Sequence, residues 1–194
     1  MIPAHILLKA YITGIFPMAE GRNGKVNWYE ADPRGILDIY EFHCPKRLVR
    51  TYQSGKFVVK INSKFRETIE GCAQAPRDGT WISEEIIESY MNLHKLGYAH
   101  SVESYLQNSD DLAGGLYGVA IGGAFFGESM FYRITDASKI ALVALIEHLR
   151  EKKYQLLDMQ MLTEHMRQFG GKLISKREYH ILLQKALEQD CKFI

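Results

Sequence analysis

The sequence predicts a mixed α/β (α+β) fold, and three observations support that prediction. Strand-like apolar runs follow one another at His100–Leu106, Leu112–Ile121 and Ala124–Tyr132. Apolar residues then recur at helical spacing over Ser138–Lys152. A short apolar run, Leu156–Gln160, comes next. Alternation with a period of two indicates strands, and a period near 3.6 indicates helices. A strand meander followed by alternating helices and strands favours one mixed sheet with flanking helices.

Residues 1–55 are expected to form a small N-terminal lobe, and residues 56–194 the main domain. A helix is expected from Pro3 to about Ile12, because proline suits the first turn of a helix. Gly14 and Pro17 end it. Two short strands are expected on either side of an Asp-Pro-Arg-Gly turn, and a short basic helix follows them. These three elements are expected at Val26–Glu30, Ile36–Tyr40 and Cys44–Tyr52.

The next elements lead into the meander and then away from it. A strand with alternating pattern at Phe57–Asn62 precedes two helices. Ser63 is expected to cap the first helix and Ser83 the second, which ends at Gly97. A turn at Arg77-Asp78-Gly79 separates the two helices. The last three elements are expected to be a short helix, a strand and a helix, at Thr163–Phe169, Lys172–Ser175 and Arg177–Gln189.

Composition narrows the class of protein. The chain has 194 residues and a net charge of +1, so any contact with nucleic acid should be local rather than spread over a basic surface. The three cysteines, Cys44, Cys72 and Cys191, lack metal or disulfide spacing, which favours reduced thiols in a cytoplasm. The apolar N-terminus carries His5 and Lys9 and is too short to span a membrane. We therefore expect no export signal, membrane segment or metal site.

A polar cluster interrupts the apolar middle of the chain. Glu128 lies inside a strand-like run, and Asp158 and Gln160 lie two residues apart on a later strand. Two residues apart on a strand means the same face of the sheet. Buried polar groups are costly unless they are paired or used. The sequence therefore indicates a functional site near these three side chains.

The order of elements in the second half resembles the acyltransferase fold typified by the N-acetyltransferases. In that fold a glycine-rich loop at the helix after the meander holds a pyrophosphate. The corresponding junction here is Ile134-Thr135-Asp136-Ala137-Ser138-Lys139, which has no pair of glycines. A pyrophosphate loop is therefore not supported, and acetyl-CoA is a poor candidate for the acyl donor.

Long motifs stand in a fixed order along the chain. They include Gly14-Ile15-Phe16-Pro17-Met18, Asp32-Pro33-Arg34, Gly79-Thr80-Trp81-Ile82, Ala99-His100-Ser101-Val102-Glu103, Gly114-Gly115-Leu116-Tyr117-Gly118-Val119-Ala120 and Phe126-Gly127-Glu128-Ser129-Met130-Phe131. With these motifs the chain resembles the leucyl/phenylalanyl-tRNA–protein transferases, from about residue 7 to about residue 185. It departs from the family's Trp-Trp-Ser-Pro segment, which is here Trp28-Tyr29-Glu30-Ala31, and it has a shorter N-terminal lobe than many members.

The resemblance implies a reaction and its partners. Such an enzyme transfers Leu, and also Phe and Met, from its tRNA to the N-terminal α-amine of proteins that begin with Arg or Lys. The product is marked for degradation by the N-end rule. An aminoacyl ester is already activated, so the reaction needs no metal, no cofactor and no covalent enzyme intermediate. Holding ester and amine together can itself supply ~7–11 kcal/mol of the barrier.

The resemblance also implies roles for the polar cluster. Asp158 would hold Gln160, and Gln160 would orient the incoming amine. Glu128 would pair with the basic side chain of the acceptor through charge-assisted hydrogen bonds. Two alternatives stay open: Asp158 could only cap a neighbouring backbone group, and Glu128 could form a salt bridge with Lys139 or Arg133.

An apolar pocket for the aminoacyl side chain is implied at seven positions, which from the sequence alone read as core residues. They are Leu116, Phe125, Met130, Leu142, Leu145, Leu149 and Leu157. Some family members have Phe at the positions of Leu145 and Leu149, so the preference between Leu and Phe is open. At the entrance, Trp28 and Trp81 suit stacking on the terminal adenosine, and Tyr90 could donate a hydrogen bond near the site.

Other functions remain possible at this point. One is an N-acetyltransferase-like enzyme, and another is a non-enzymatic binder of basic N-termini. Two basic clusters could contact tRNA phosphates: Lys46, Arg47 and Arg50, or Lys172, Lys176 and Arg177. The oligomeric state cannot be read from the sequence.

Overall fold

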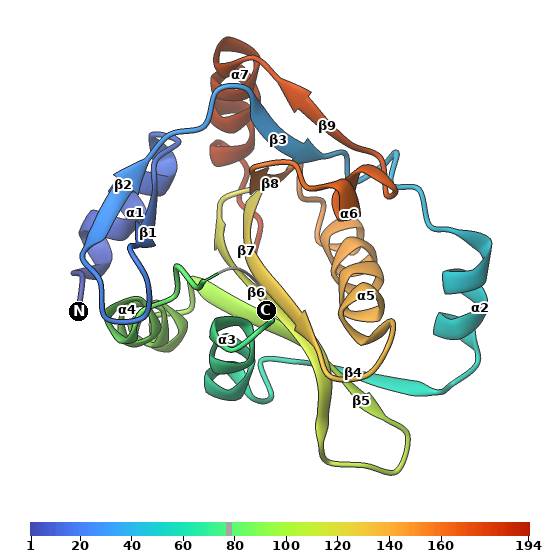
Figure 1. Cartoon of the computed structure of the whole chain (residues 1–194). Coiled ribbons are helices and arrows are strands. Elements are labelled where there is room, and N and C mark those ends of the chain that lie inside the picture. Colours follow the sequence, from blue (N-terminus) through green and yellow to red (C-terminus); the bar gives the residue numbers. More distant parts are fainter. Residues whose placement is uncertain (77–78) are drawn as a thin grey trace.

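The computed structural model describes residues 1–76 and 79–194 and has one large mixed sheet with helices against both faces (Figure 1). Its seven strands lie in the order β4-β5-β6-β7-β8-β3-β9, and a separate two-stranded sheet joins β1 to β2. The predicted mixed α/β fold with flanking helices is confirmed. The turn predicted at Arg77-Asp78-Gly79 falls in part outside the described residues.

Most elements lie within a few residues of their predicted positions. The strands are β1 Phe16–Ala19, β2 Val26–Tyr29, β3 Arg34–Leu37, β4 Phe57–Ile61, β5 Ala99–Leu106, β6 Leu112–Ile121, β7 Ala124–Tyr132, β8 Leu156–Gln160 and β9 Gly171–Ile174. The helices are α1 Ala4–Ile12, α2 Lys46–Gln53, α3 Phe65–Ala73, α4 Glu84–Lys95, α5 Ala137–Glu151, α6 Glu164–Arg167 and α7 Lys176–Leu187.

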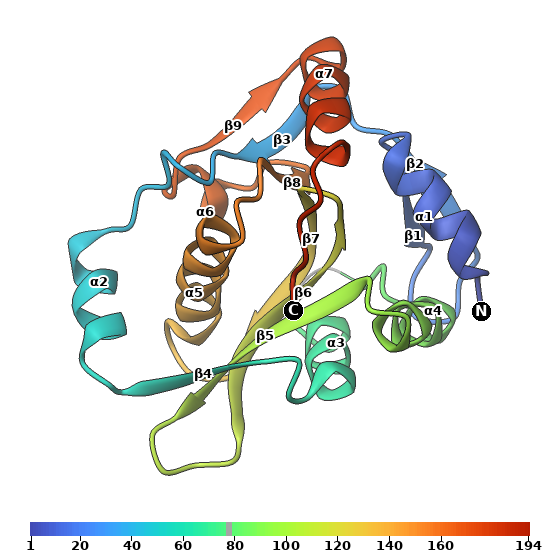
Figure 2. The same ribbon diagram turned by 180° about the vertical axis from the view of Figure 1, so that it is seen from behind.

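Two hydrophobic cores cover the two faces of the sheet. Neighbouring strand residues point to opposite faces, so Phe126 packs into the core that includes α3 and α4, and Phe125 packs into the core that includes α5. In the same way, Val119 of β6 packs into the first of these cores and Ala120 packs into the second. Figures 1 and 2 show α3 and α5 on opposite sides of the central strands.

The strand β3 belongs to the main sheet, although it comes from the first 55 residues of the chain. It lies between β8 and β9 and is antiparallel to both. The Asp-Pro-Arg-Gly segment therefore does not close a hairpin with β2, which pairs with β1 instead. All four residues of β3 are buried. Long-range partners that cover both faces set its position, and a local turn motif does not encode them.

Two local predictions need correction, and one is confirmed. Pro17 was expected only to end the first helix, but it lies within β1, a strand of the two-stranded sheet where a missing N–H is tolerated. Ser63 does not cap α3, whose N-cap residue is Lys64. Ser83 does cap α4, because its side chain accepts a hydrogen bond from the backbone N–H of Ile86. None of the helices described is long and apolar enough to cross a membrane.

The strands β7 and β8 run parallel and then separate, which positions the site. They pair at Ala124–Leu156, Phe125–Leu157 and Phe126–Asp158. The residues of β7 that follow, from Gly127 onward, pair with β6 only, within the part of the chain that the structure describes. The rest of β7 therefore leaves space between the two strands.

One glycine in this hairpin has no room for a side chain. A Cβ atom at Gly118 would lie 2.4 Å from the carbonyl oxygen of Phe126 and 2.4 Å from the ring of Phe125. Its cross-strand partner Gly127 would meet nothing closer than 3.5 Å, at the carbonyl oxygen of Asp158. We expect Gly118→Ala to lower the free energy of unfolding by ~1–3 kcal/mol through overpacking. Gly127→Ala, the matched control, should change it by less than about half as much. Urea denaturation of both variants checks this, and equal losses would contradict it.

Candidate functional site

A cavity of about 620 Å³ opens where β7 and β8 separate. Much of its wall is apolar and comes from leucine and methionine side chains on β6, β7, α5, β8 and α6. The strand β1 and the segment around Trp81 complete it. Glu128 and Gln160 also line the cavity, and with Tyr11 and Tyr90 they form what we call the polar end. The cavity therefore combines a long apolar surface with a small group of polar atoms.

Glu128 reaches the cavity because it occupies a β-bulge. Gly118 of β6 pairs with Gly127, and the preceding residue, Tyr117, pairs with Ser129, so Glu128 is the extra residue on β7. A bulge re-aims a side chain and is frequent next to active sites. The bulge therefore explains how a carboxylate inside an apolar strand comes to face the cavity.

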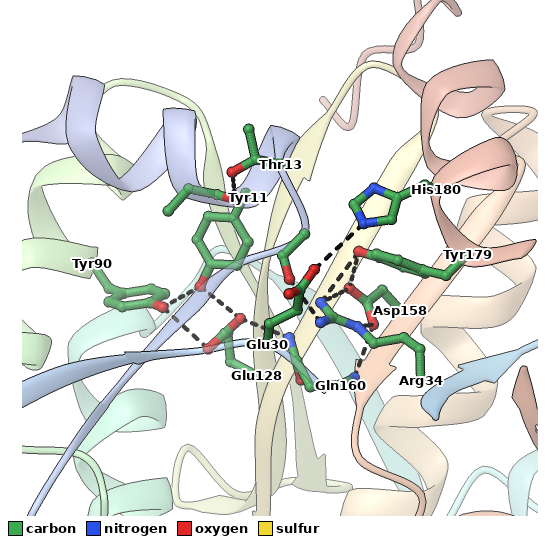
Figure 3. A network of polar contacts seen from close by, with 12 residues as sticks. Tyr11, Thr13, Glu30, Arg34, Tyr90, Glu128, Asp158, Gln160, Tyr179 and His180 are labelled. Carbon is green, nitrogen blue, oxygen red and sulfur yellow. Dashed lines mark hydrogen bonds and ion pairs between the residues drawn. The ribbon is translucent and has the colours of Figure 1, made fainter. Parts of the chain in front are cut away.

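Three donors hold the Glu128 carboxylate (Figure 3). Tyr11 donates to Oε1 at 2.7 Å, Tyr90 donates to Oε2 at 3.1 Å, and the side-chain amide of Gln160 donates to Oε1 at 3.2 Å. The hydroxyls of Tyr11 and Tyr90 also contact each other. Burial, and then the nearby Glu128, raise the pKa of both tyrosines, so both stay protonated as donors. The carboxylate therefore has one fixed orientation.

Burial raises the pKa of Glu128 from an ordinary value of 4.5 to about 7. The hydrogen bonds from Tyr11 and Tyr90 act in the opposite direction, Asp158 raises the pKa further, and Arg34 lowers it. A carboxyl group with a pKa near 7 exchanges its proton at neutral pH. The polar end can therefore hold either a negative charge or a proton, depending on what binds beside it.

Gln160 ends β8 in an unusual backbone conformation. Its φ of 57° lies in the left-handed region, which costs a residue other than glycine of order 1–3 kcal/mol. Its backbone N–H donates to Oδ1 of Asp158 at 2.9 Å. Asp158 therefore holds the main chain of Gln160, and the left-handed turn directs the side chain of Gln160 toward Glu128.

Asp158 itself is fully buried and is not among the residues that line the cavity. Arg34 forms a bidentate ion pair with it, through Nε to Oδ1 at 2.9 Å and Nη2 to Oδ2 at 2.7 Å. Tyr179 donates to Oδ2 at 2.7 Å. Asp158 therefore caps a backbone N–H, and that N–H belongs to Gln160. Figure 3 shows this group beside the polar end.

The predicted pocket residues divide into two groups. Five of them line the cavity: Leu116, Met130, Leu142, Leu145 and Leu157. Phe125 and Leu149 do not, and both are fully buried in the core on the α5 side. The difference follows from position, because Phe125 lies where β7 and β8 still pair and Leu149 lies at the far end of α5.

The predicted entrance residues divide in the same way. Trp81 lines the cavity, whereas Trp28 on β2 is 42% exposed and does not. Tyr90 does not line the cavity, but it donates a hydrogen bond to Glu128, which does. The structure does not have the alternative salt bridge between Glu128 and Lys139, because Lys139 pairs with Asp136 at 3.5 Å.

Three important residues were not identified from the sequence: Tyr11, Arg34 and Tyr179. Tyr11 lies on α1 and is buried, and helical spacing alone does not distinguish a core residue from a site residue. Arg34 belongs to the quoted Asp32-Pro33-Arg34 motif, but a charged residue beside a turn usually faces solvent. Its 1% exposure could have been suspected only from the apolar residues that follow it.

The basic clusters are partly neutralised. Arg47 pairs with Asp136, Lys172 with Asp38, and Lys176 with Glu30. A second hollow, of about 410 Å³, is lined by Arg47, Arg50 and Lys56 together with Asp136 and small polar residues. Across the described ranges, no group of three or more His, Cys, Asp or Glu side chains is arranged to hold a metal ion.

Comparison with known proteins defines the class as aminoacyltransferases. The model of the family described as leucyl/phenylalanyl-tRNA protein transferase matches residues 36–184, and the model of its N-terminal domain matches residues 1–32. The transferase of this name from Gloeobacter violaceus is 48% identical over 188 residues, 97% of this chain and 95% of that protein. The one from Synechococcus is 44% identical over 188 residues, 96% of each chain.

This chain belongs to the leucyl/phenylalanyl-tRNA–protein transferase family. It is therefore an enzyme that moves an aminoacyl group from tRNA to a protein. Family membership favours this activity over the two alternatives, an N-acetyltransferase and a non-enzymatic binder. Among solved structures, L-PGS from Bacillus licheniformis is similar to 95% of this chain and 70% of its own, with 12% identity and a TM-score of 0.48.

The raised pKa of Glu128 has a consequence for stability. The folded protein binds the proton more tightly than the unfolded chain, so this group's contribution is complete below about pH 4.5 and is lost as pH rises to about 7. Glu128→Gln removes that loss. We expect it to raise the free energy of unfolding at pH 8 by up to ~3 kcal/mol, with a smaller gain at pH 5. Urea denaturation at the two pH values measures this. Exposed Glu188→Gln is the control, and a gain independent of pH would contradict the assignment.

Proposed function

We propose that this enzyme transfers leucine, and also phenylalanine and methionine, from tRNA to the N-terminal α-amine of proteins that begin with Arg or Lys. One observation carries the proposal: Glu128 is the single carboxylate among the described residues that line the cavity, and it lies at the end of an apolar wall. The apolar wall suits the donor side chain. The carboxylate suits a cationic acceptor side chain, through charge-assisted hydrogen bonds.

The proposed reaction is a direct aminolysis. The α-amine nitrogen attacks the ester carbonyl carbon, a C–N bond forms, and the C–O bond to the ribose breaks. The ribose oxygen leaves as a hydroxyl with one proton, and the amine loses one proton. An α-amine has an ordinary pKa of ~7.7–8.0, so a sizeable fraction is neutral at neutral pH. Positioning of the amine and the ester is then the main task of the enzyme.

In this proposal Gln160 orients the amine. Its side-chain N–H₂ donates to Glu128, which leaves the amide oxygen of Gln160 to accept a hydrogen bond from the incoming amine. Asp158 acts through Gln160 and not as a free base, because its carboxylate is paired with Arg34 and buried. Trp81 stands at the cavity wall, where the terminal adenosine of the tRNA can stack on it.

We further propose a cytoplasmic enzyme whose products enter N-end-rule degradation. This follows from the acceptors proposed above, and the three free cysteines suit a reducing compartment.

A second role for Glu128 is favoured by one specific observation. Its pKa of about 7 is close to that of an α-amine, so its carboxylate could take the proton that the amine loses. The two roles differ in which acceptors need the carboxylate. Charge recognition matters only for acceptors that begin with Arg or Lys, whereas proton transfer matters for all of them.

The acceptor role of Glu128 is tested with Glu128→Gln and two peptides. One begins with Arg and the other with citrulline, which has nearly the same shape without the charge. If Glu128 reads the charge, KM for the Arg peptide should rise by about 10-fold or more, since a hydrogen bond to a charged group contributes ~1.5–3 kcal/mol. KM for the citrulline peptide should change little. An equal fall in kcat for both peptides would instead support proton transfer, and unchanged constants would remove both roles.

The donor preference is tested with matched tRNA bodies that carry different amino acids. Much of the apolar wall comes from long leucine and methionine side chains that are not branched at Cβ, so Leu, Phe and Met should all be accepted. Ile and Val widen the donor next to the ester and should react ~10–200-fold more slowly, because a small misfit is worth only ~1–3 kcal/mol. Single-turnover transfer to one Arg peptide measures the rates. Equal rates for Ile and Leu would contradict the assigned pocket.

A further inference from the structure

We propose that Arg34 is a positioning residue for the transfer reaction, because its guanidinium connects the two parts of the structure that hold Gln160 and Glu128. The inference rests on the proposed roles of those two residues. Arg34 is 1% exposed and does not line the cavity, so it acts through its neighbours and not on the substrates.

The first connection leads to Gln160. The bidentate pair between Arg34 and Asp158 fixes both carboxylate oxygens, and Tyr179 is within hydrogen-bond distance of both partners, at 3.2 Å from Nη2 and 2.7 Å from Oδ2. Oδ1 of Asp158 also accepts the backbone N–H of Gln160. The guanidinium therefore orients the oxygen that holds Gln160 in its left-handed conformation.

The second connection leads to Glu128. Nη1 of Arg34 donates to the carbonyl oxygen of Gly14 at 2.8 Å. Gly14 follows the C-terminus of α1 and has a φ of 81°, and the same helix carries Tyr11, which donates to Glu128. A single side chain thus joins the end of α1 to β8. Figure 3 shows Arg34, Tyr11 and Glu128 in one view.

The geometry needs an arginine. Three of its nitrogens, Nε, Nη1 and Nη2, each donate to a different acceptor atom. The guanidinium carbon Cζ lies over two rings, 4.4 Å from the ring centre of Tyr179 and 5.0 Å from that of Phe16. Lysine keeps the charge but cannot form a planar bidentate pair or stack in this way. Arg34→Lys therefore separates geometry from charge. It should leave Asp158 paired but free to reorient, and Gln160 with it.

The test is single-turnover transfer of Leu from saturating tRNA to an Arg-starting peptide. We expect Arg34→Lys to lower the transfer rate by roughly 10–100-fold, since a misplacement of about 1 Å can cost about 100-fold. Arg66→Lys is the matched control. Arg66 pairs with Glu88 and Glu70 on the surface of α3 and α4, away from the cavity wall, and its replacement should keep the rate within about twofold.

A double-mutant cycle distinguishes positioning from a merely structural role. If Arg34 acts through Gln160, then Arg34→Lys should cost much less in a Gln160→Ala background than in the wild type. If Arg34 only stabilises the fold, its cost should be the same in both. Wild-type rates in Arg34→Lys, or fully multiplicative losses, would overturn the proposal. Should Arg34→Lys fail to fold, Tyr179→Phe replaces it in the same cycle with Gln160→Ala. Tyr179→Phe alone should lower the transfer rate by about 3–10-fold, the usual cost of one hydrogen bond.

The use of two acceptor peptides keeps the test of Arg34 separate from the test of the proposed function. The wild type is first assayed with the Arg and citrulline peptides. Absence of any preference would overturn the acceptor role of Glu128. The coupling between Arg34 and Gln160 is then measured on whichever peptide reacts, so its presence or absence reports on Arg34 alone.

Discussion

The buried ion pair between Arg34 and Asp158 is the interaction on which the rest of the site depends. Both side chains are almost completely removed from solvent, and removal of one partner of such a pair leaves an uncompensated charge. Replacement of both by apolar residues is often neutral for stability. The pair is therefore better explained by what it positions: the end of α1 on one side, and the backbone of Gln160 on the other.

The polar end of the cavity is organised at a cost to stability. Glu128 stays next to an apolar wall with a pKa of about 7, and Gln160 adopts a left-handed conformation. Each is unfavourable by itself. Tyr11 and Tyr90, which are far away in the sequence, hold Glu128, and the carboxylate of Asp158 holds the backbone N–H of Gln160. Strain and shifted pKa values of this kind gather where an enzyme needs groups in one fixed arrangement.

The cavity and its polar end have the same structural origin. Because β7 leaves β8 after three residue pairs, the space between the strands is open, and leucines of α5 and β8 line it. The bulge at Glu128 lies just beyond that point of separation and turns the carboxylate toward the same space. In the proposed function, an apolar slot beside the one carboxylate among the described lining residues lets an apolar donor and a cationic acceptor meet.

The sequence by itself determined the class of fold, the order of nearly all elements, the family, and the residues Glu128, Asp158 and Gln160 as one cluster. These follow from local periodicity and from motifs whose residues are adjacent in the chain. Only the tertiary structure decided that β3 enters the main sheet, that Phe125 and Leu149 lie behind the cavity, and that Trp28 lies outside it. It also decided the partners of Asp158 and Glu128. The physical reason is that strand register, the separation of β7 from β8, and contacts between residues more than 100 positions apart depend on packing that no local pattern encodes.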